Sequence, residues 1–171
     1  KVSVVGVGFI GLEVAEQLKE RGFDVTLIER AGQVLPPLDA EMAEPLRREL
    51  LRQGIRLISG SGFKAIRESA GKATGVVLEN GVTVEADLVI LGLGVRPYNQ
   101  LAVAAGLGVG ATGGILTDEY QRTADQDIYA VGDAAEYLIG TTGQRGRIPL
   151  AGIANRTGRL VGEHAATGKS A

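Results

Sequence analysis

Three glycines near the start of the chain have the spacing of a phosphate-binding turn. Gly6, Gly8 and Gly11 form a G-x-G-x-x-G pattern between an apolar run and a helical pattern. In such a turn the first glycine permits a tight bend, the second lets the backbone approach a pyrophosphate, and the third lets the helix pack closely. The helix N-terminus would then face the anion. The pattern predicts a dinucleotide site, which Phe9 and Ile10 within the turn are expected to border.

Glu29 stands where an acidic residue would complete this site, because it ends the next apolar run of the chain. A carboxylate there accepts hydrogen bonds from a ribose 2′-hydroxyl and repels a 2′-phosphate, which favours NADH over NADPH. The neighbouring Arg30 is able to reach a 2′-phosphate, so NADPH stays possible. The alternative is a glycine turn that binds no ligand.

Glu13 is a second carboxylate close to the glycine turn. It lies two residues after Gly11, in the first turns of the expected helix. The helix dipole stabilises a negative charge there. Spacing alone therefore accounts for Glu13 without any catalytic role.

Two later apolar runs also end in glycine. Gly92 and Gly94 follow one of them, and Gly132 and Asp133 follow the other. In open parallel sheets, ligands bind beyond the carboxyl ends of the strands, where glycines permit close approach. Asp133 would there accept hydrogen bonds from the hydroxyls of a sugar or ribityl chain. The alternatives are an ordinary loop at the first position and an Asx-type turn at the second.

The last helical pattern begins near Leu150 and Ala151, directly after Pro149. Proline is common in a first helical turn, and the N–H groups of such a turn are able to face a ligand carbonyl. His164 is the single histidine and falls late in this helix. We expect it to be a solvated residue near the negative end of the dipole rather than a catalytic one.

Hydrophobic periodicity and turn signals predict an α/β fold. The opening strand, glycine turn, helix and strand have the size of a βαβ unit. Short strand patterns over 62–67, 73–79 and 82–86 predict an antiparallel meander, and Asn80-Gly81 is typical of a type I′ hairpin. The other expected strands are 2–6, 24–29, 55–59, 87–91, 115–117 and 127–131, with a polar excursion over 137–147. The expected helices run from Ile10 to a stop at Gly22, over 39–53 with a kink or late start at Pro45, over 99–105, and from Pro149 onward.

Composition excludes several kinds of chemistry. The 171 residues include 26 glycines but no cysteine, and the formal charge is −2. Without cysteine the chain has no disulfide, no Cys-ligated metal and no redox thiol, and no metal site is expected. A near-neutral chain whose apolar runs are shorter than the ~20 residues of a membrane helix predicts neither nucleic acid nor membrane as a partner. We expect a cytoplasmic protein.

The patterns, in this order, resemble the flavin-dependent pyridine nucleotide-disulfide oxidoreductases. The segments VSVVGVGFIGLEVAEQL and TADQDIYAVGDAAE carry the likeness, and RIPLAGIANRTGRLVGEH is most similar to the coenzyme A-disulfide reductase and NADH oxidase branch. In that family an NADH domain is inserted between two halves of an FAD domain. The resemblance therefore implies a Rossmann-like NAD(P)H-binding domain over 1–115 and the C-terminal half of a split FAD domain over 116–171.

The resemblance also implies roles for the candidate residues, and it gives Glu13 one that spacing alone does not. The resemblance makes Glu13 the expected catalytic residue, a carboxylate that would pair with a lysine near the contact between nicotinamide and flavin. The remaining assignments place Gly6, Gly8, Gly11 and Glu29 on NADH, Gly92 and Gly94 on the nucleotide-facing loop, Gly132 and Asp133 at the ribityl chain of FAD, and Leu150 and Ala151 near the flavin ring.

Several parts of the family pattern are absent from this sequence. They are the earlier glycine motif for FAD, the redox cysteine, the lysine partner of Glu13 and the dimerisation domain, and the loop normally reading Pro-Asn is Pro97-Tyr98-Asn99. Because the chain also opens on a strand without a preceding Met, we expect a piece of a longer protein that binds NADH, binds FAD weakly or not at all, and is inactive alone. Its exposed strand edges predict a homo-oligomer.

The full-length protein is expected to pass a hydride from NAD(P)H to FAD and then electrons to a disulfide, such as coenzyme A disulfide, or to oxygen. Two alternatives remain open. One is a flavoenzyme of the ferredoxin or rubredoxin reductase type with a protein electron acceptor, and the other is a nucleotide-binding module without redox chemistry.

Overall fold

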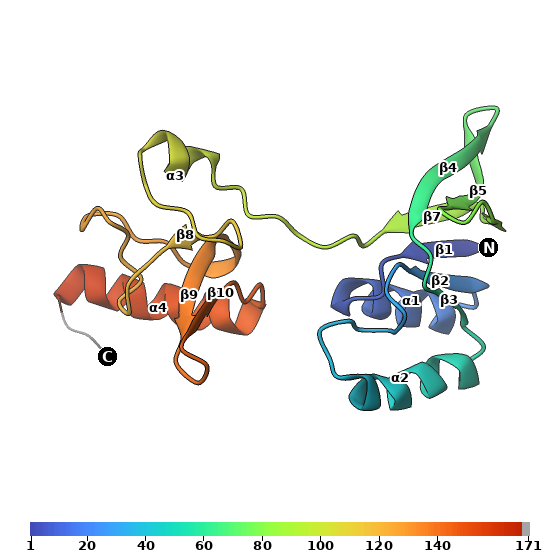
Figure 1. The fold of residues 1–171 in the computed structure, drawn as a ribbon, viewed down its shortest axis with the longest axis horizontal. Helices are drawn as coiled ribbons and strands as arrows, with labels where there is room; N and C mark the ends of the chain where they lie inside the picture. Colours follow the sequence, from blue (N-terminus) through green and yellow to red (C-terminus); the bar gives the residue numbers. More distant parts are fainter. Residues whose placement is uncertain (169–171) are drawn as a thin grey trace. The chain divides into compact units, whose positions relative to one another are not determined.

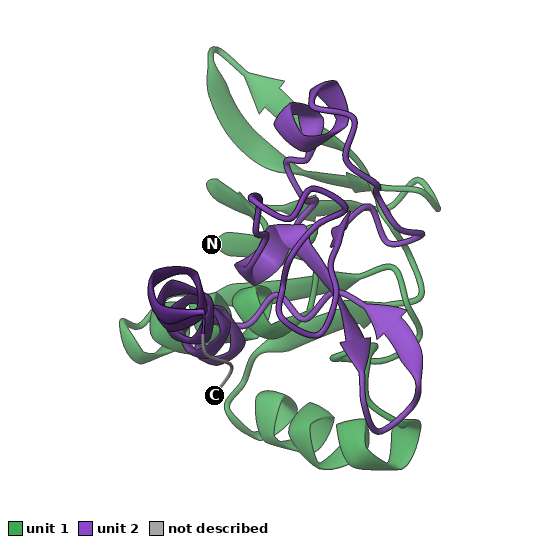
Figure 2. Ribbon diagram, turned by 90° about the vertical axis from the view of Figure 1, so that its left-hand side faces the viewer, with its two compact units in different colours: residues 1–94 green, residues 95–171 purple. Residues whose placement is uncertain are grey.

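A computed structural model describes residues 1–168, and the chain divides into two compact units, Lys1–Gly94 and Val95–Ala171 (Figures 1 and 2). Each unit has its own hydrophobic core. The last three residues of the predicted 116–171 segment lie outside the described residues. The boundary between the compact units, after Gly94, precedes the functional boundary expected at residue 115. The functional division into 1–115 and 116–171 remains a prediction.

The centre of unit 1 is a parallel sheet. Its strands are β1 (Val2–Val5), β2 (Val25–Glu29), β3 (Arg56–Ser59) and β7 (Leu88–Leu91), in the order β3-β2-β1-β7. Every neighbouring pair is parallel. Parallel strands covered on both faces read as continuous apolar runs, which is why the sequence predicted these strands well.

Two helices cover one face of this sheet. They are α1 (Phe9–Glu20) and α2 (Ala40–Arg52), and Figure 1 shows both on the same side of the strands. Val4 and Leu27 point into the core that the helices cover, where Ala15 is fully buried. The expected late start of α2 at Pro45 is wrong, since the helix begins directly after Asp39 and continues through the proline.

Ion pairs link successive turns of α2. Hydrogen bonds from Arg47 and Arg48 lower the pKa of the Glu44 carboxyl to about 2. Hydrogen bonds from Arg52 and Gln53 do the same for Glu49, whose pKa is also lowered to about 2. Both carboxylates therefore stay ionised at any physiological pH.

The predicted antiparallel meander covers the other face of the sheet. Strands β4 (Phe63–Ser69), β5 (Lys72–Leu78) and β6 (Thr83–Glu85) pair in the order β4-β5-β6. Their buried residues share a second core with the sheet residues Val5 and Ile28; the meander residues of that core are Val76, Leu78 and Val84. The α/β fold class with its meander is thus confirmed.

The two hairpin turns of the meander differ from the sequence expectation. The Asn80-Gly81 hairpin exists, but its predicted type I′ turn is wrong, because only Gly81 has a positive φ, of 84°. The Gly81 N–H donates to the Leu78 carbonyl at 3.0 Å, and Gly81 then acts as a left-handed bulge. Ala70 and Gly71 instead have φ angles of 51° and 76°, the pattern of a type I′ turn.

Replacing Ala70 by asparagine should stabilise this hairpin. Alanine in the left-handed region is strained, whereas asparagine tolerates it, so Ala70→Asn should raise the free energy of unfolding by about 0.5–1 kcal/mol. Urea unfolding followed by circular dichroism measures the change. The exposed strand residue Ala65 provides the control, since Ala65→Asn should not stabilise the protein. An equal gain in both variants would contradict a turn-specific effect.

Unit 2 is a small sheet with two α-helices and a short 3₁₀ helix. Its elements are α3 (Gln100–Ala104), β8 (Ile115–Leu116), the 3₁₀ helix η1 (Gly132–Ala134), β9 (Ala135–Ile139), β10 (Gln144–Gly146) and α4 (Ala151–Thr167). The strand order is β10-β9-β8, in which β8 pairs parallel with β9 and β10 pairs antiparallel. The hairpin β9–β10 occupies most of the segment that was expected to be a polar excursion.

The expected strand over 127–131 is wrong. Only Tyr129 in it makes an isolated β-bridge, with Arg122. The Thr123 hydroxyl donates to the carbonyls of Asp125 and Ile128, both at 3.0 Å, and the Thr123 N–H donates to Ile128 at 2.9 Å. These local hydrogen bonds between side chain and backbone hold the segment as a compact loop instead of a sheet strand.

None of the helices within residues 1–168 combines the length and the hydrophobicity of a transmembrane span. The same residues contain no cluster of three or more histidine and carboxylate side chains that would hold a metal ion.

Candidate functional site

The glycine turn joins β1 to α1 with backbone packed against backbone. Gly6 has a φ of +94°, and a Cβ atom there would lie 2.3 Å from the Gly92 carbonyl oxygen. A Cβ atom at Gly11 would lie 1.9 Å from the Gly6 carbonyl oxygen. Gly92 itself donates its N–H to the Val5 carbonyl at 2.7 Å. The three glycines therefore let the ends of β1 and β7 and the start of α1 approach one another.

Gly8 differs from these glycines because it faces open space. Its φ of −83° suits any residue, and a Cβ atom there would meet nothing within 4 Å. Leu12 makes the first hydrogen bond of α1, to the Gly8 carbonyl at 3.0 Å. The N–H groups of Phe9, Ile10 and Gly11 thus have no helical partner, as in the first turn of any helix, and remain available to an anion.

The side chains of Phe9 and Ile10 lie at the open side of the same turn. They are 56% and 54% exposed, although both are large and apolar. The structure therefore brings together the residues that the glycine motif predicted, with open space next to Gly8 and apolar side chains beside it.

Glu29 lies at the carboxyl end of β2, next to the glycine turn. Its two carboxylate oxygens accept the Val7 N–H at 2.7 Å and the Ala31 N–H at 2.9 Å. Two charge-assisted hydrogen bonds hold the carboxylate in one orientation, and each oxygen keeps a free lone pair. The arrangement is able to accept hydrogen bonds from two neighbouring hydroxyls, as a ribose would offer.

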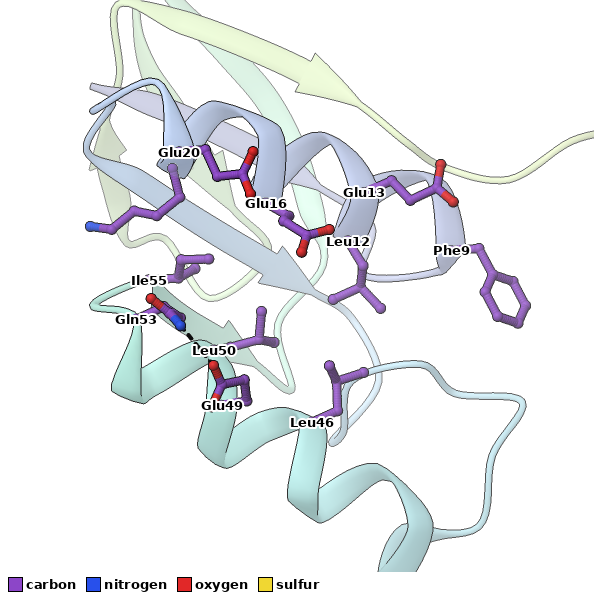
Figure 3. A pocket seen from close by; sticks show the side chains of 11 residues that line it. Phe9, Leu12, Glu13, Glu16, Glu20, Leu46, Glu49, Leu50, Gln53 and Ile55 are labelled. Atoms are coloured by element: carbon purple, nitrogen blue, oxygen red, sulfur yellow. Dashed lines mark hydrogen bonds between the residues drawn. The ribbon is translucent and has the colours of Figure 1, made fainter.

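Glu13 is exposed near the start of α1. It lies at one end of a pocket of about 460 Å³ between α1 and α2, and its side chain points away from α2 (Figure 3). Leu12, Leu46 and Leu50 form part of the apolar lining between the helices. No hydrogen bond within the described residues engages the Glu13 carboxylate, which leaves it free to pair with a cation.

The second predicted loop of unit 1 contains Gly92 and Gly94. Gly92 is fully accounted for by its backbone packing against Gly6 and Val5. Gly94 has a φ of +88° and faces open space. Its conformation requires a glycine, whereas its contact with a nucleotide remains a prediction.

The predicted flavin residues of unit 2 gather beside the start of α4. A Cβ atom at Gly132, whose φ is +74°, would lie 3.5 Å from the Ala154 side chain in the first turn of that helix. The neighbouring Asp133 is exposed, and its carboxylate makes none of the hydrogen bonds that an Asx turn requires within residues 1–168. Leu150 and Ala151 form the exposed N-terminus of α4.

Sequence reasoning missed a buried carboxylate in unit 2. Glu136 is only 2% exposed and accepts hydrogen bonds from the N–H group and the hydroxyl of Thr112. Gly110 and Gly114 pack directly against its side chain. Glu136 therefore holds the loop before β8 in place. The two glycines of this loop were the only sequence signal, and they do not identify their partner.

His164 also differs from the expectation of a solvated side chain. It is half-buried, stacks on Tyr120 at 5.3 Å between ring centres and meets the edge of Tyr129 at 6.0 Å. It lines a small cavity of about 130 Å³. The aromatic contacts give it a packing role in unit 2.

The order of these features is that of a known flavoenzyme family. The chain matches the family model for pyridine nucleotide-disulphide oxidoreductases over residues 1–158. The chain belongs to this family. The resemblance inferred from the sequence motifs is thereby confirmed.

Relatives and solved structures agree with this membership. The NADH oxidase of Methanocaldococcus jannaschii is 39% identical over 168 residues, which cover 97% of this chain and 37% of that protein. Rhodocoxin reductase of Rhodococcus erythropolis is 37% identical over 153 residues, which cover 89% of this chain and 35% of that protein. The structure of an NAD-dependent persulfide reductase from A. fulgidus has a TM-score of 0.93 at 39% identity and covers 99% of this chain and 31% of its own. The chain thus spans little more than a third of these curated relatives.

Proposed function

We propose that this chain is the NAD(P)H-binding part of an FAD-dependent oxidoreductase and that it prefers NADH. One observation carries the proposal: the Glu29 carboxylate is fixed by two backbone N–H groups beside an open glycine turn. The turn offers unpaired N–H groups for a pyrophosphate, and Glu29 offers acceptors for a ribose. The names of the relatives, an NADH oxidase and an NAD-dependent persulfide reductase, support the same cofactor.

In this proposal the protein groups bind and orient the hydride donor. The first turn of α1 holds the pyrophosphate, Glu29 holds the adenosine ribose, and the loop at Gly92 and Gly94 borders the nucleotide. The exposed Phe9 and Ile10 shield one side of the site from water. Glu13 is a positioning residue that pairs with a lysine of the parent protein near the nicotinamide.

The residues of unit 2 fit a flavin in part. The exposed Asp133 would accept hydrogen bonds from ribityl hydroxyls, and the N–H group of Ala151 would face a carbonyl of the flavin ring. The N–H group of Leu150 instead donates to the Ile148 carbonyl at 2.8 Å, so Leu150 would border the flavin through its exposed side chain. Bound FAD would supply the hydride-accepting chemistry. We propose residues 1–115 as the NAD(P)H domain and 116–171 as the second FAD segment, so that the rest of the flavin site belongs to sequence outside this chain.

The electrons leave the parent protein to a disulfide, such as coenzyme A disulfide, or to oxygen. The relation to the NADH oxidase supports this choice. A protein electron acceptor is the second candidate, because the sequence identity of rhodocoxin reductase to this chain, 37%, is close to the 39% of the NADH oxidase. The proposal also includes a cytoplasmic location and a homo-oligomer for the chain.

Titration of the 171-residue chain with NADH, NADPH and FAD tests the proposal. We expect NADH to bind, NADPH to bind more weakly, and FAD to bind weakly or not at all. Glu29→Gln should weaken NADH binding about 10-fold or more. The amide group of glutamine is uncharged, and its single oxygen cannot accept both backbone hydrogen bonds. The exposed α2 residue Glu41 gives the control Glu41→Gln, which should leave the dissociation constant unchanged. Tight FAD binding with a flavin absorbance band, or no NADH binding, would contradict the proposal.

A further inference from the structure

A second carboxylate reaches the end of β2 from the meander. Glu79 lies in the turn of the β5–β6 hairpin, and its Oε2 is 3.9 Å from the Nε of Arg30. Arg30 directly follows Glu29, the residue proposed to bind the ribose. The Arg30 guanidinium thus follows one carboxylate in sequence, that of Glu29, and pairs with a second one from the meander.

The Glu79 side chain is placed by the backbone around it. Its N–H donates to the Gly62 carbonyl at 2.9 Å, and a Cβ atom at Gly62 would lie 2.6 Å from Glu79 Oε2. The carboxylate therefore packs directly against Gly62, in the loop that follows β3. A larger residue at that position would displace it.

The same loop connects the hairpin to the end of β2. Gly60 donates its N–H to the Ala31 carbonyl at 2.9 Å, and Ser61 donates its N–H to the Glu29 carbonyl at 3.3 Å. Residues 60–62 thus hold Glu79 on one side and residues 29–31 on the other. The position of Glu79 relative to Arg30 is a property of the folded unit, even though both side chains are largely exposed.

We propose that Glu79 is a specificity-determining residue for the pyridine nucleotide, through its ion pair with Arg30. The inference rests on the proposed NADH site. A dinucleotide with a free ribose 2′-hydroxyl needs no cation here, whereas a 2′-phosphate would need Arg30 as a partner. Glu79 competes for that guanidinium. The competition acts against NADPH and leaves NADH almost unaffected.

The expected effect is moderate because the pair is exposed. Exposed ion pairs are weak, so removal of Glu79 should change the ratio of NADPH to NADH affinity by about 5-fold. The change should decrease as salt rises from 0.05 to ~0.5 M, because exposed charges are screened. A structural role of Glu79 in folding alone would affect both nucleotides equally and would not depend on salt in this way.

The test compares Glu79→Gln with native protein, using the 171-residue chain and calorimetric titration with NADH and NADPH at low salt. We expect the dissociation constant for NADPH to fall about 5-fold and that for NADH to change less than 2-fold. Glu85→Gln is the matched control, because Glu85 lies on the same meander and pairs with Lys1 at 2.8 Å. It should leave both constants unchanged.

The double variant Arg30→Ala with Glu79→Gln separates the two parts of the inference. Measured against Arg30→Ala alone, the double variant should show no gain in NADPH affinity, and a persistent gain would overturn the role of the ion pair. An unchanged nucleotide ratio in Glu79→Gln, with native NADH binding intact, would overturn the inference and leave the proposed function standing. If the native chain bound neither nucleotide, the proposed function would fail first and the inference with it.

Discussion

Gly8→Val should abolish most NADH binding and leave the fold intact. The Gly8 backbone has a φ of −83° and a ψ of −171°, an extended conformation that valine adopts without strain. A Cβ atom there has nothing within 4 Å, so the side chain starts in open space. It would occupy the space next to the first turn of α1, where the pyrophosphate is proposed to lie. The dissociation constant for NADH should rise about 100-fold.

Calorimetric titration measures the loss of affinity, and urea unfolding measures stability. The free energy of unfolding should change by about 1 kcal/mol at most, since valine is only a poorer helix cap than glycine. Gly140 is a matched control, because it also lacks a positive φ and faces open space, but belongs to unit 2. Gly140→Val should bind NADH normally. Normal NADH binding by Gly8→Val would show that the dinucleotide does not use this turn.

The sequence predicted the parts of unit 1 whose residues have only one suitable environment. Val4 and Leu27 belong to apolar runs that suit strands covered on both faces, and both are fully buried. The G-x-G-x-x-G spacing likewise fits one geometry of strand, turn and helix. These local rules agree with the tertiary packing, so the sheet, the helices and the glycine turn followed from pattern alone.

The errors arose where side chains compete with the backbone or where the partner is distant in sequence. Residues 127–131 are apolar enough for a strand, but the Thr123 hydroxyl satisfies nearby carbonyls and favours a loop. Asn80-Gly81 has the composition of a type I′ turn, yet the three-residue loop there takes another form. The buried Glu136 accepts hydrogen bonds from Thr112, 24 residues away, and no local pattern reveals this partner.

Local patterns predicted the positions of the site residues but not the partners of their side chains. Glu29 follows from its place at the end of a strand, but its fixation by the N–H groups of Val7 and Ala31 does not. The approach of Glu79 to Arg30 depends on how the meander lies on the sheet, so only the structure reveals it. Periodicity locates the elements, and packing of one element on another selects the side-chain partners.

Gly6→Ala should destabilise unit 1 by about 3 kcal/mol. Two costs add at this position. Alanine at a φ of +94° is strained, at about 1–2 kcal/mol, and its Cβ atom would lie 2.3 Å from the Gly92 carbonyl oxygen. That oxygen belongs to the backbone and moves only if β1 and β7 separate, so overpacking adds about 1–3 kcal/mol.

Gly94→Ala separates strain from crowding. Gly94 has a similar φ of +88°, but a Cβ atom there meets nothing within 4 Å. It should therefore cost about 1–2 kcal/mol, the strain alone. Comparison of Gly6→Ala with Gly94→Ala isolates the cost of forcing apart the ends of the two strands.

The measurement must report on unit 1 by itself. All four tyrosines of the chain, residues 98, 120, 129 and 137, lie in unit 2, so tyrosine fluorescence follows that unit. Hydrogen exchange of the buried amides of Val4 and Leu27 follows unit 1. Gly6→Ala should lower the protection of these amides more than 10-fold below that in Gly94→Ala. Equal protection in the two variants would mean that the close approach of Gly6 to Gly92 contributes nothing to the stability of the sheet.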